Sequence, residues 1–387
     1  MNASPSTDRA EPTSDVVLDL AGLQSLLDVL HARGFTVIGP TVRDGAIVNA
    51  PITSVGDLPR GWGDAQEPGS YRIRRRGDDL LFGFTAGPQS WKAELFPARV
   101  PLWSADRTGE GLTVQVPDPR PPAYAFLGVR ACDLRAITIQ DAILAERVPD
   151  ADYVRRREPA FVVALTCSDP AATCFCVSMG SGPVPGPGFD LALTELLDDD
   201  GHRFVVRAGT DRGAEVLDAV PATAAAPGDT DAAREVGEMA ASRMVRSMET
   251  DGLRDLLYRN VEHPRWDDVA DRCLSCTNCT MVCPTCFCTS VEEVSDLRGD
   301  HVEQHRVWES CFTAEHSHLP GGSVRPATRS RYRQWMTHKL ASWQDQFGMS
   351  GCVGCGRCIA WCPVGIDITE EAAAIRATDG VRGGAAP

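Results

Sequence analysis

Two cysteine runs of identical spacing lie near the C-terminus of this chain. The first is Cys273-x2-Cys276-x2-Cys279-x3-Cys283 and the second is Cys352-x2-Cys355-x2-Cys358-x3-Cys362, each followed by a proline. With this spacing, three close cysteines typically bind one [4Fe–4S] cluster, and the fourth cysteine ligates the neighbouring cluster. The predicted ligands of the first cluster are Cys273, Cys276, Cys279 and Cys362, and those of the second cluster are Cys352, Cys355, Cys358 and Cys283.

Zinc and disulfide bonds are the alternatives for these eight cysteines. Zinc sites usually pair two CxxC motifs, without a four-cysteine run closed by proline, and disulfides belong mainly to secreted proteins. The first residues, MNASPSTDRAEPTSD, contain neither the basic segment nor the apolar segment of a secretory signal. We therefore expect reduced thiols, two [4Fe–4S] clusters and a cytoplasmic location.

Four more cysteines are expected to meet at one edge of a sheet. Cys132 follows one predicted strand and Cys167 follows the next, with Cys174 and Cys176 a few residues beyond. The carboxyl ends of strands in an α/β sheet converge where such folds build sites. This clustering favours a third [4Fe–4S] cluster on these four cysteines. The alternative is four small buried side chains that pack in the core.

Three cysteines stay outside these groups. Cys286 and Cys288 belong to a Thr-Cys-Phe-Cys segment, 285–288, which repeats the Thr-Cys-Phe-Cys segment at 173–176, and Cys311 follows later. A mixed metal site with His316 and His318 is one interpretation. Packing around the clusters is favoured over it, because free cysteine behaves as a small buried hydrophobe.

The second cysteine run begins in a glycine-rich loop, residues 350–356. Glycine has no Cβ, so main-chain N–H groups in this loop can approach cluster sulfur closely and raise the redox potential. Arg357, next to Cys358, either adds a positive field to a cluster or is a solvated surface arginine. The sequence leaves both interpretations of Arg357 open.

A composition of Ser, Thr, Pro and acidic residues predicts a disordered tail over 1–15. Apolar periodicity predicts that an α/β domain follows over 16–225 and includes the third cluster site. A strand, a helix and a second strand in this region predict a βαβ unit. The expected elements are a helix over 20–33, a hairpin of 35–38 with 46–48, a hairpin of 71–75 with 80–84, and the βαβ unit of 123–129, 134–145 and 161–166.

A helical connector over 226–262, with helical patterns over 232–248 and 253–258, leads to a C-terminal domain over 263–387. An insertion separates the two cysteine runs and contains a predicted helix over 331–347. Apolar side chains share one face of that helix, which the core explains. They are Tyr332, Trp335, Met336, Leu340 and Trp343. The predicted fold class is α+β, with an N-terminal α/β domain followed by a helical, ferredoxin-like domain for two [4Fe–4S] clusters.

The composition and the missing motifs exclude several classes of function. The net charge of −15 argues against nucleic acid as a partner, and no apolar run approaches the ~18–20 residues that span a bilayer. The sequence has no P-loop, no GxSxG or HExxH motif, no Cys–His nucleophile signature and no further CxxC pairs for a nickel–iron centre. We therefore expect an electron-transfer subunit without a substrate site of its own.

Four sequence segments resemble segments of a known protein family. They are GVRACDLRA at 128–136, DYVRRRE at 152–158, TCFCVSMG at 173–180 and CVGCGRCI at 352–359. Together with the order of the two runs, they resemble the beta subunit of soluble sulfhydrogenase-type nickel–iron hydrogenases over residues 16–370. They are also similar to the electron-transfer subunit of anaerobic sulfite reductase.

The resemblance implies a relay of single electrons. Its partners would be an FAD- and NAD(P)-binding reductase subunit on one side and the small and large subunits of a nickel–iron hydrogenase on the other. Two alternatives stay open: the electron-transfer subunit of an anaerobic sulfite reductase with a siroheme partner, and, in a different class, an iron–sulfur sensor or scaffold protein. The acidic charge and the missing helix-turn-helix argue against a sensor that binds DNA.

Overall fold

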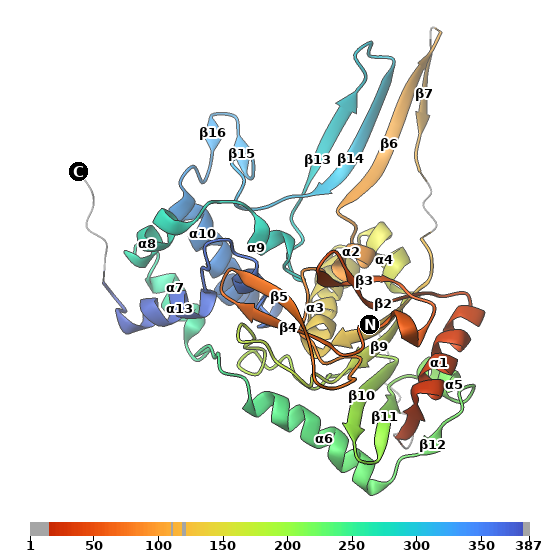
Figure 1. The fold of residues 1–387 in the computed structure, drawn as a ribbon. Coiled ribbons are helices and arrows are strands. Elements are labelled where there is room, and N and C mark those ends of the chain that lie inside the picture. Colours follow the sequence, from red (N-terminus) through yellow and green to blue (C-terminus); the bar gives the residue numbers. More distant parts are fainter. Residues whose placement is uncertain (1–14, 110, 118–120, 382–387) are drawn as a thin grey trace, which may run out of the picture.

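A mixed eight-stranded sheet forms the centre of the N-terminal region in the computed structural model, which describes residues 15–109, 111–117 and 121–381 (Figure 1). The strand order is β12-β1-β11-β10-β9-β8-β2-β3, and β10, β9, β8 and β2 are mutually parallel while the outer pairs are antiparallel. All of the predicted tail except Asp15 lies outside the described residues. The strands are β1 Val16–Asp19, β2 Thr36–Arg43, β3 Ala46–Pro51, β8 Tyr124–Arg130, β9 Phe161–Leu165, β10 Leu191–Asp198, β11 Gly201–Ala208 and β12 Thr223–Ala224.

The two faces of this sheet pack into two different cores. Because side chains alternate along a strand, Phe161 and Val163 of β9 join the core beneath helix α1 (Leu20–Ala32), whereas Val162 points into the other core. Helix α1 begins where the Asp19 side chain accepts a hydrogen bond from the Gly22 N–H at 2.7 Å. The opposite core contains helix α3 (Ala131–Asp141) together with Trp343 and Val353 from the C-terminal region. The sheet is thus covered by helices on both faces.

The predicted βαβ unit is confirmed. Strand β8, helix α3 and strand β9 follow one another, and β8 and β9 pair in parallel. Helix α3 begins and ends earlier than predicted and continues into a π-helical turn, Ala142–Arg147. The hairpin of β2 with β3 is also confirmed.

The predicted hairpin of 71–75 with 80–84 is wrong. Strand β5 (Ser70–Arg75) pairs instead with β4 (Trp62–Glu67), a segment with few apolar residues. Residues 80–84 do not form a strand, because the Leu81 and Phe82 N–H groups donate to the buried Glu195 carboxylate at 2.6 and 2.8 Å. A side chain more than one hundred positions away therefore takes the place of a strand partner.

A second, four-stranded sheet projects from the body of the molecule (Figure 1). Its order is β13-β14-β6-β7, so the insertion between the cysteine runs contributes one hairpin and the N-terminal region contributes the other. All pairs are antiparallel. The strands are β6 Arg99–Thr108, β7 Gly111–Gln115, β13 Thr289–Ser295 and β14 His301–Trp308. This sheet was not predicted, since strands β6 and β14 are widely separated in the sequence.

Helices dominate the C-terminal region. The helix predicted over 331–347 is confirmed as α10 (Thr328–Thr337), a π-helical turn (His338–Ser342) and α11 (Trp343–Phe347) in succession. Connector helix α6 runs over Pro227–Ser242, earlier than predicted, because Pro227 occupies its first turn. The other helices are α2 Lys92–Leu95, α4 Ala151–Arg157, α5 Asp211–Leu217, α7 Leu253–Arg259, α8 Arg265–Arg272, α9 Asn278–Met281, α12 Arg357–Ala360 and α13 Ile368–Ala377, with a 3-10 turn at Val55–Asp57 and short strands β15 His318–Leu319 and β16 Gly322–Ser323.

Candidate metal centres

The two cysteine runs fold into loops of matching backbone conformation. In each run, one residue between the first and second cysteines and one between the second and third have a positive φ. They are Ser275 (φ 49°) and Thr277 (φ 69°) in the first run, and Gly354 (φ 63°) and Gly356 (φ 76°) in the second. Holding non-glycine residues in this region costs of order 1–3 kcal/mol each, and such strain is concentrated at functional sites. Both loops therefore curl in the same way before a short helix, α9 or α12, that carries the third cysteine.

Two adjacent cavities each bring together one predicted set of four cysteines, three from one run and the fourth from the other. The first cavity is lined by Cys273, Cys276, Cys279 and Cys362. The second cavity is lined by Cys352, Cys355, Cys358 and Cys283. Cys358 also lines the first cavity, so the two cavities share a wall. The structure thus brings together the two predicted sets of four, whose role as ligands stays a prediction.

Backbone N–H groups point at the cysteine sulfurs. The Gly354 N–H donates to Cys352 Sγ at 3.4 Å, as expected for the glycine-rich loop. In the first site, the Ser275 N–H donates to Cys273 Sγ at 3.4 Å. Such hydrogen bonds stabilise negative charge on sulfur and raise the potential of a bound cluster. The donor set, four soft thiols with N–H groups around them, fits an iron–sulfur cluster.

Lys339 adds a buried positive charge to the second site. Its Nζ donates to Cys283 Sγ at 3.1 Å and to Thr285 Oγ1 at 2.9 Å. Burial alone would lower the pKa of the Lys339 ammonium, but the Cys283 and Cys286 sulfurs raise that pKa well above its usual range. A hydrogen bond from the Cys286 thiol, together with Lys339, lowers the pKa of the Cys283 thiol. Cys283 is therefore disposed to be a thiolate, the form that binds metal.

Arg357 is a buried residue, so its interpretation as a solvated surface arginine is wrong. It is only 1% exposed. Its guanidinium donates to both carboxylate oxygens of Asp133 at 2.7 and 2.8 Å and to the Gly87 carbonyl at 2.8 Å. Asp133 lies in the first turn of α3, next to Cys132. This bidentate ion pair therefore ties the second cysteine run to the sheet.

The other predicted cluster site lies at the carboxyl edge of strands β8 and β9. Cys132 lies in the first turn of helix α3, directly after β8, and Cys167 follows β9. Cys174 and Cys176 are buried, and the Arg130 guanidinium donates to Cys167 Sγ at 3.2 Å. Burial raises the pKa of the Cys176 thiol to about 12, with further contributions from Cys167 and Cys355. The four sulfurs thus lie in one neighbourhood, as predicted, beside the second cysteine cavity.

The segment 173–176 packs directly on the second cysteine loop. The Phe175 N–H donates to the Gly354 carbonyl at 2.9 Å, and Cys174 Sγ lies 3.9 Å from the Cys355 carbonyl oxygen. A Cβ on Gly354 would lie 2.7 Å from the Phe175 backbone, and one on Gly356 would lie 2.5 Å from the Thr173 carbonyl. Glycine is therefore required at both positions for this close approach as well as for the positive φ.

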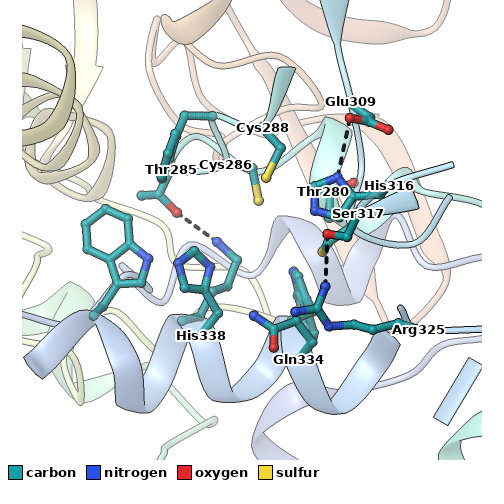
Figure 2. Close-up of a pocket in the computed structure, with 15 residues that line it drawn as sticks. Thr280, Thr285, Cys286, Cys288, Glu309, His316, Ser317, Arg325, Gln334 and His338 are labelled. Carbon is teal, nitrogen blue, oxygen red and sulfur yellow. Dashed lines mark hydrogen bonds and ion pairs between the residues drawn. The ribbon is translucent and has the colours of Figure 1, made fainter. Parts of the chain in front are cut away.

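The three remaining cysteines line a cavity of about 140 Å³ (Figure 2). Cys286, Cys288 and Cys311 share its wall with His316, whereas His318 is exposed on β15 and is not among the lining residues. The structure places a cavity beside these three thiols, and their packing around the clusters stays a prediction. His338 also lines this cavity, and burial lowers the pKa of its imidazole to about 4.

The importance of the two lysines was missed from the sequence. Lys92 and Lys339 are the only lysines among 38 basic Lys and Arg residues. Both are about 5% exposed. Lys92 Nζ donates to the Cys286 carbonyl at 3.1 Å and lies 3.7 Å from the centre of the Trp308 ring. The sequence contained a sign of their importance, because the chain has only two lysines among many arginines. One of them, Lys339, is next to Leu340 in an apolar stripe of the predicted helix.

Comparisons with known proteins agree with this geometry. Residues 272–366, which include both cysteine runs, match the model of a 4Fe-4S dicluster domain. The chain is also 33% identical over 252 residues to the sulfhydrogenase 2 subunit beta of Pyrococcus furiosus, an alignment that covers 63% of this chain and 71% of that relative. No solved structure matches the chain. The dicluster match implies two [4Fe–4S] clusters.

Helices long and apolar enough for a bilayer crossing are absent from the part of the chain that the structure describes.

Proposed function

This chain belongs to the family of sulfhydrogenase beta subunits, and on that premise we propose that it relays single electrons between a flavin subunit that reacts with NAD(P)H and the small and large subunits of a nickel–iron hydrogenase. When bound, [4Fe–4S] clusters supply this chemistry, because each takes up and releases one electron at a time. The residues of the chain hold the clusters, tune their potentials and limit access of water. The pair of adjacent cysteine-lined cavities that share Cys358 carries the proposal.

The crosswise supply of cysteines supports a relay rather than two independent sites. The fourth cysteine of each run lies in the cavity of the other run, so neither site is complete without both loops. Helix α13 fixes this arrangement, because the fully buried Glu371 carboxylate accepts hydrogen bonds from Arg265 and Arg272 of α8, the helix that leads into Cys273. The proposed ligands are Cys273, Cys276, Cys279 and Cys362 for one cluster, and Cys352, Cys355, Cys358 and Cys283 for the other.

A third cluster on Cys132, Cys167, Cys174 and Cys176 would extend the relay toward the sheet. Its support is the packing of segment 173–176 on the second cysteine loop and the buried Asp133–Arg357 pair that fixes helix α3 to the same loop. The third centre would then lie beside the second, and the first would lie on the far side of the second. Three centres in succession fit a chain that connects two partner subunits.

The test uses the assembled complex of this chain with its partner subunits. In the Cys358→Ser variant, we expect the transfer of electrons from NAD(P)H to protons to be lost, because Cys358 lies at the wall between both cavities. Two partial reactions, dye reduction on the flavin side and hydrogen oxidation on the nickel–iron side, should persist when each is measured separately. Asn278→Ala is the matched control, since Asn278 is the first residue of α9, within the first cysteine run, and carries no sulfur.

Normal coupled turnover in the Cys358→Ser complex would contradict the relay. A chain that purifies without flavin and hydrogenase subunits and still changes its cluster state with cellular conditions would point to a sensor instead.

A further inference from the structure

We propose that Cys286, Cys288 and Cys311 bind an additional iron–sulfur cluster, one of whose irons has no cysteine ligand. The site is the cavity of about 140 Å³ between helix α10 with its π-helical turn and the base of the β13–β14 hairpin (Figure 2). This centre is separate from the two clusters of the dicluster domain and from the third cluster proposed at the sheet edge.

The projecting hairpin brings the three thiols together. Cys288 directly precedes β13, and Cys311 follows the end of β14. The Glu309 N–H donates to the Cys288 carbonyl at 2.9 Å, which closes the base of the hairpin. Thr280 of α9 donates to Ser310 Oγ at 2.8 Å, so the segment that carries Cys311 is also attached to the first cysteine run.

The cavity has room for a cluster. The two cavities of the dicluster domain measure about 30 and 20 Å³. The cavity beside Cys286 is therefore several times larger than the two cavities for which cubanes are proposed above. Neither packing of small buried thiols nor a closed core accounts for a cavity of this size beside three cysteines.

Three thiols are the ligand type that iron–sulfur clusters use. Soft thiolate ligands select zinc and iron–sulfur clusters among the metals of proteins. A group of three or more His, Cys, Asp or Glu side chains arranged to hold a single metal ion is absent from the described ranges. We therefore assign a cluster, rather than zinc, to this site.

A cluster at this site would place negative charge beside a buried lysine. Lys92 donates to the Cys286 carbonyl oxygen, and the other lysine, Lys339, already faces the Cys283 sulfur of the second site. The Glu309 carboxylate in the cavity wall lies 3.3 Å from the His316 ring, so it has a partner of its own. Buried ammonium groups are costly unless a negative partner lies close by. A cluster held by three thiolates supplies such a partner for Lys92, whereas three neutral thiols do not.

The second dicluster site would lie between two Thr-Cys-Phe-Cys segments. Segment 173–176 contacts the loop at Gly354, and on the other side Thr285 Oγ1 donates to the Gly351 carbonyl at 2.7 Å. The repeated segments 173–176 and 285–288 thus both contact the same loop. Three thiols leave one iron facing the rest of the cavity, where Figure 2 shows the His338 ring directed toward the space beside Cys286.

The test measures iron and acid-labile sulfide in the anaerobically purified full-length chain. It compares three proteins: wild type, the Cys288→Ser/Cys311→Ser double variant and Gln334→Ala. Gln334 lines the same cavity without a thiol. We expect the double variant to lose about four iron and about four sulfide per chain relative to both others. Equal iron and sulfide in all three proteins, or the loss of stoichiometric zinc from the variant, would overturn the proposal.

A second measurement needs no variant and remains valid if the double variant does not fold. An iron without a cysteine ligand is lost on mild ferricyanide oxidation, which leaves a [3Fe–4S] cluster with its own EPR signal. We expect this signal in wild type and in Gln334→Ala, and its absence from wild type would overturn the proposal. Neither assay depends on partner subunits, so failure here and failure of the relay are distinguishable.

Discussion

The lysine beside Cys283 gives the most specific prediction about redox tuning. Replacing Lys339 with methionine removes a positive charge from the side of the second cluster and leaves a chain of similar volume. Lys339 Nζ lies 3.1 Å from Cys283 Sγ, and neighbouring sulfurs raise the pKa of its ammonium although burial opposes this, so the group is charged near neutral pH. Without this charge, an electron added to the second cluster is less stabilised, so the midpoint potential of that cluster must fall.

The size of the shift follows from Coulomb's law. With an effective dielectric constant of about 20 and about 6 Å from the ammonium to the cluster centre, the interaction is about 2.8 kcal/mol. For a one-electron couple, in which ~59 mV corresponds to a tenfold change in equilibrium constant, this amounts to roughly 120 mV. Relaxation and water entry reduce the effect, so we expect a decrease on the order of 50–120 mV.

The assay is a redox titration of the anaerobic protein followed by EPR. The second cluster should titrate at a lower potential in Lys339→Met, and so should the cluster proposed beside Cys286, because Lys339 also lines that cavity. The cluster on the far side of Cys358 should shift less because it is farther from the charge. Lys339→Arg is the matched control, since it keeps the charge. An unchanged or raised potential in Lys339→Met would refute the electrostatic role of this lysine.

Two further substitutions test how the cysteine loop is anchored. Arg357→Met leaves the buried Asp133 carboxylate without its partner, at a cost of about 3–5 kcal/mol, so the anaerobic melting temperature should fall by roughly 5–10 °C. The Arg357→Met/Asp133→Leu double variant should recover most of this loss, and a single variant as stable as wild type would exclude the anchor. Gly354→Ala should displace segment 173–176 and remove the third cluster signal, because its Cβ would lie 2.7 Å from the Phe175 backbone. Gly348→Ala has a similar positive φ but open space, so equal behaviour of the two alanine variants would contradict this explanation.

Local patterns predicted the elements whose partners lie nearby in the sequence. The apolar runs that became β8 and β9, with α3 between them, indicated a βαβ unit, and the spacing of Trp335 and Leu340 indicated a helix. The cysteine spacing predicted two sets of four cysteines, and each set lines one dicluster cavity, because the same backbone loop determines both the spacing and the geometry.

Contacts between distant segments could not be predicted in this way. The pairing of β14 with β6 joins segments that share no local signal, and the Glu195 carboxylate replaces a strand partner for Leu81. The burial of Arg357 depends on Asp133, which lies more than two hundred positions away. The cavity beside Cys286 likewise depends on a hairpin that periodicity did not reveal.

Iron content of paired cysteine variants tests the crosswise ligation most directly. With crosswise ligation, Cys273→Ser and Cys362→Ser affect one cluster, so their combination should lose no more than about four iron per chain, as either single variant does. The combination of Cys273→Ser with Cys283→Ser, both from the first run, should instead lose about eight. The opposite pattern, with about four lost from the pair within one run and about eight from the pair across runs, would show that each run binds its own cluster and would contradict crosswise ligation.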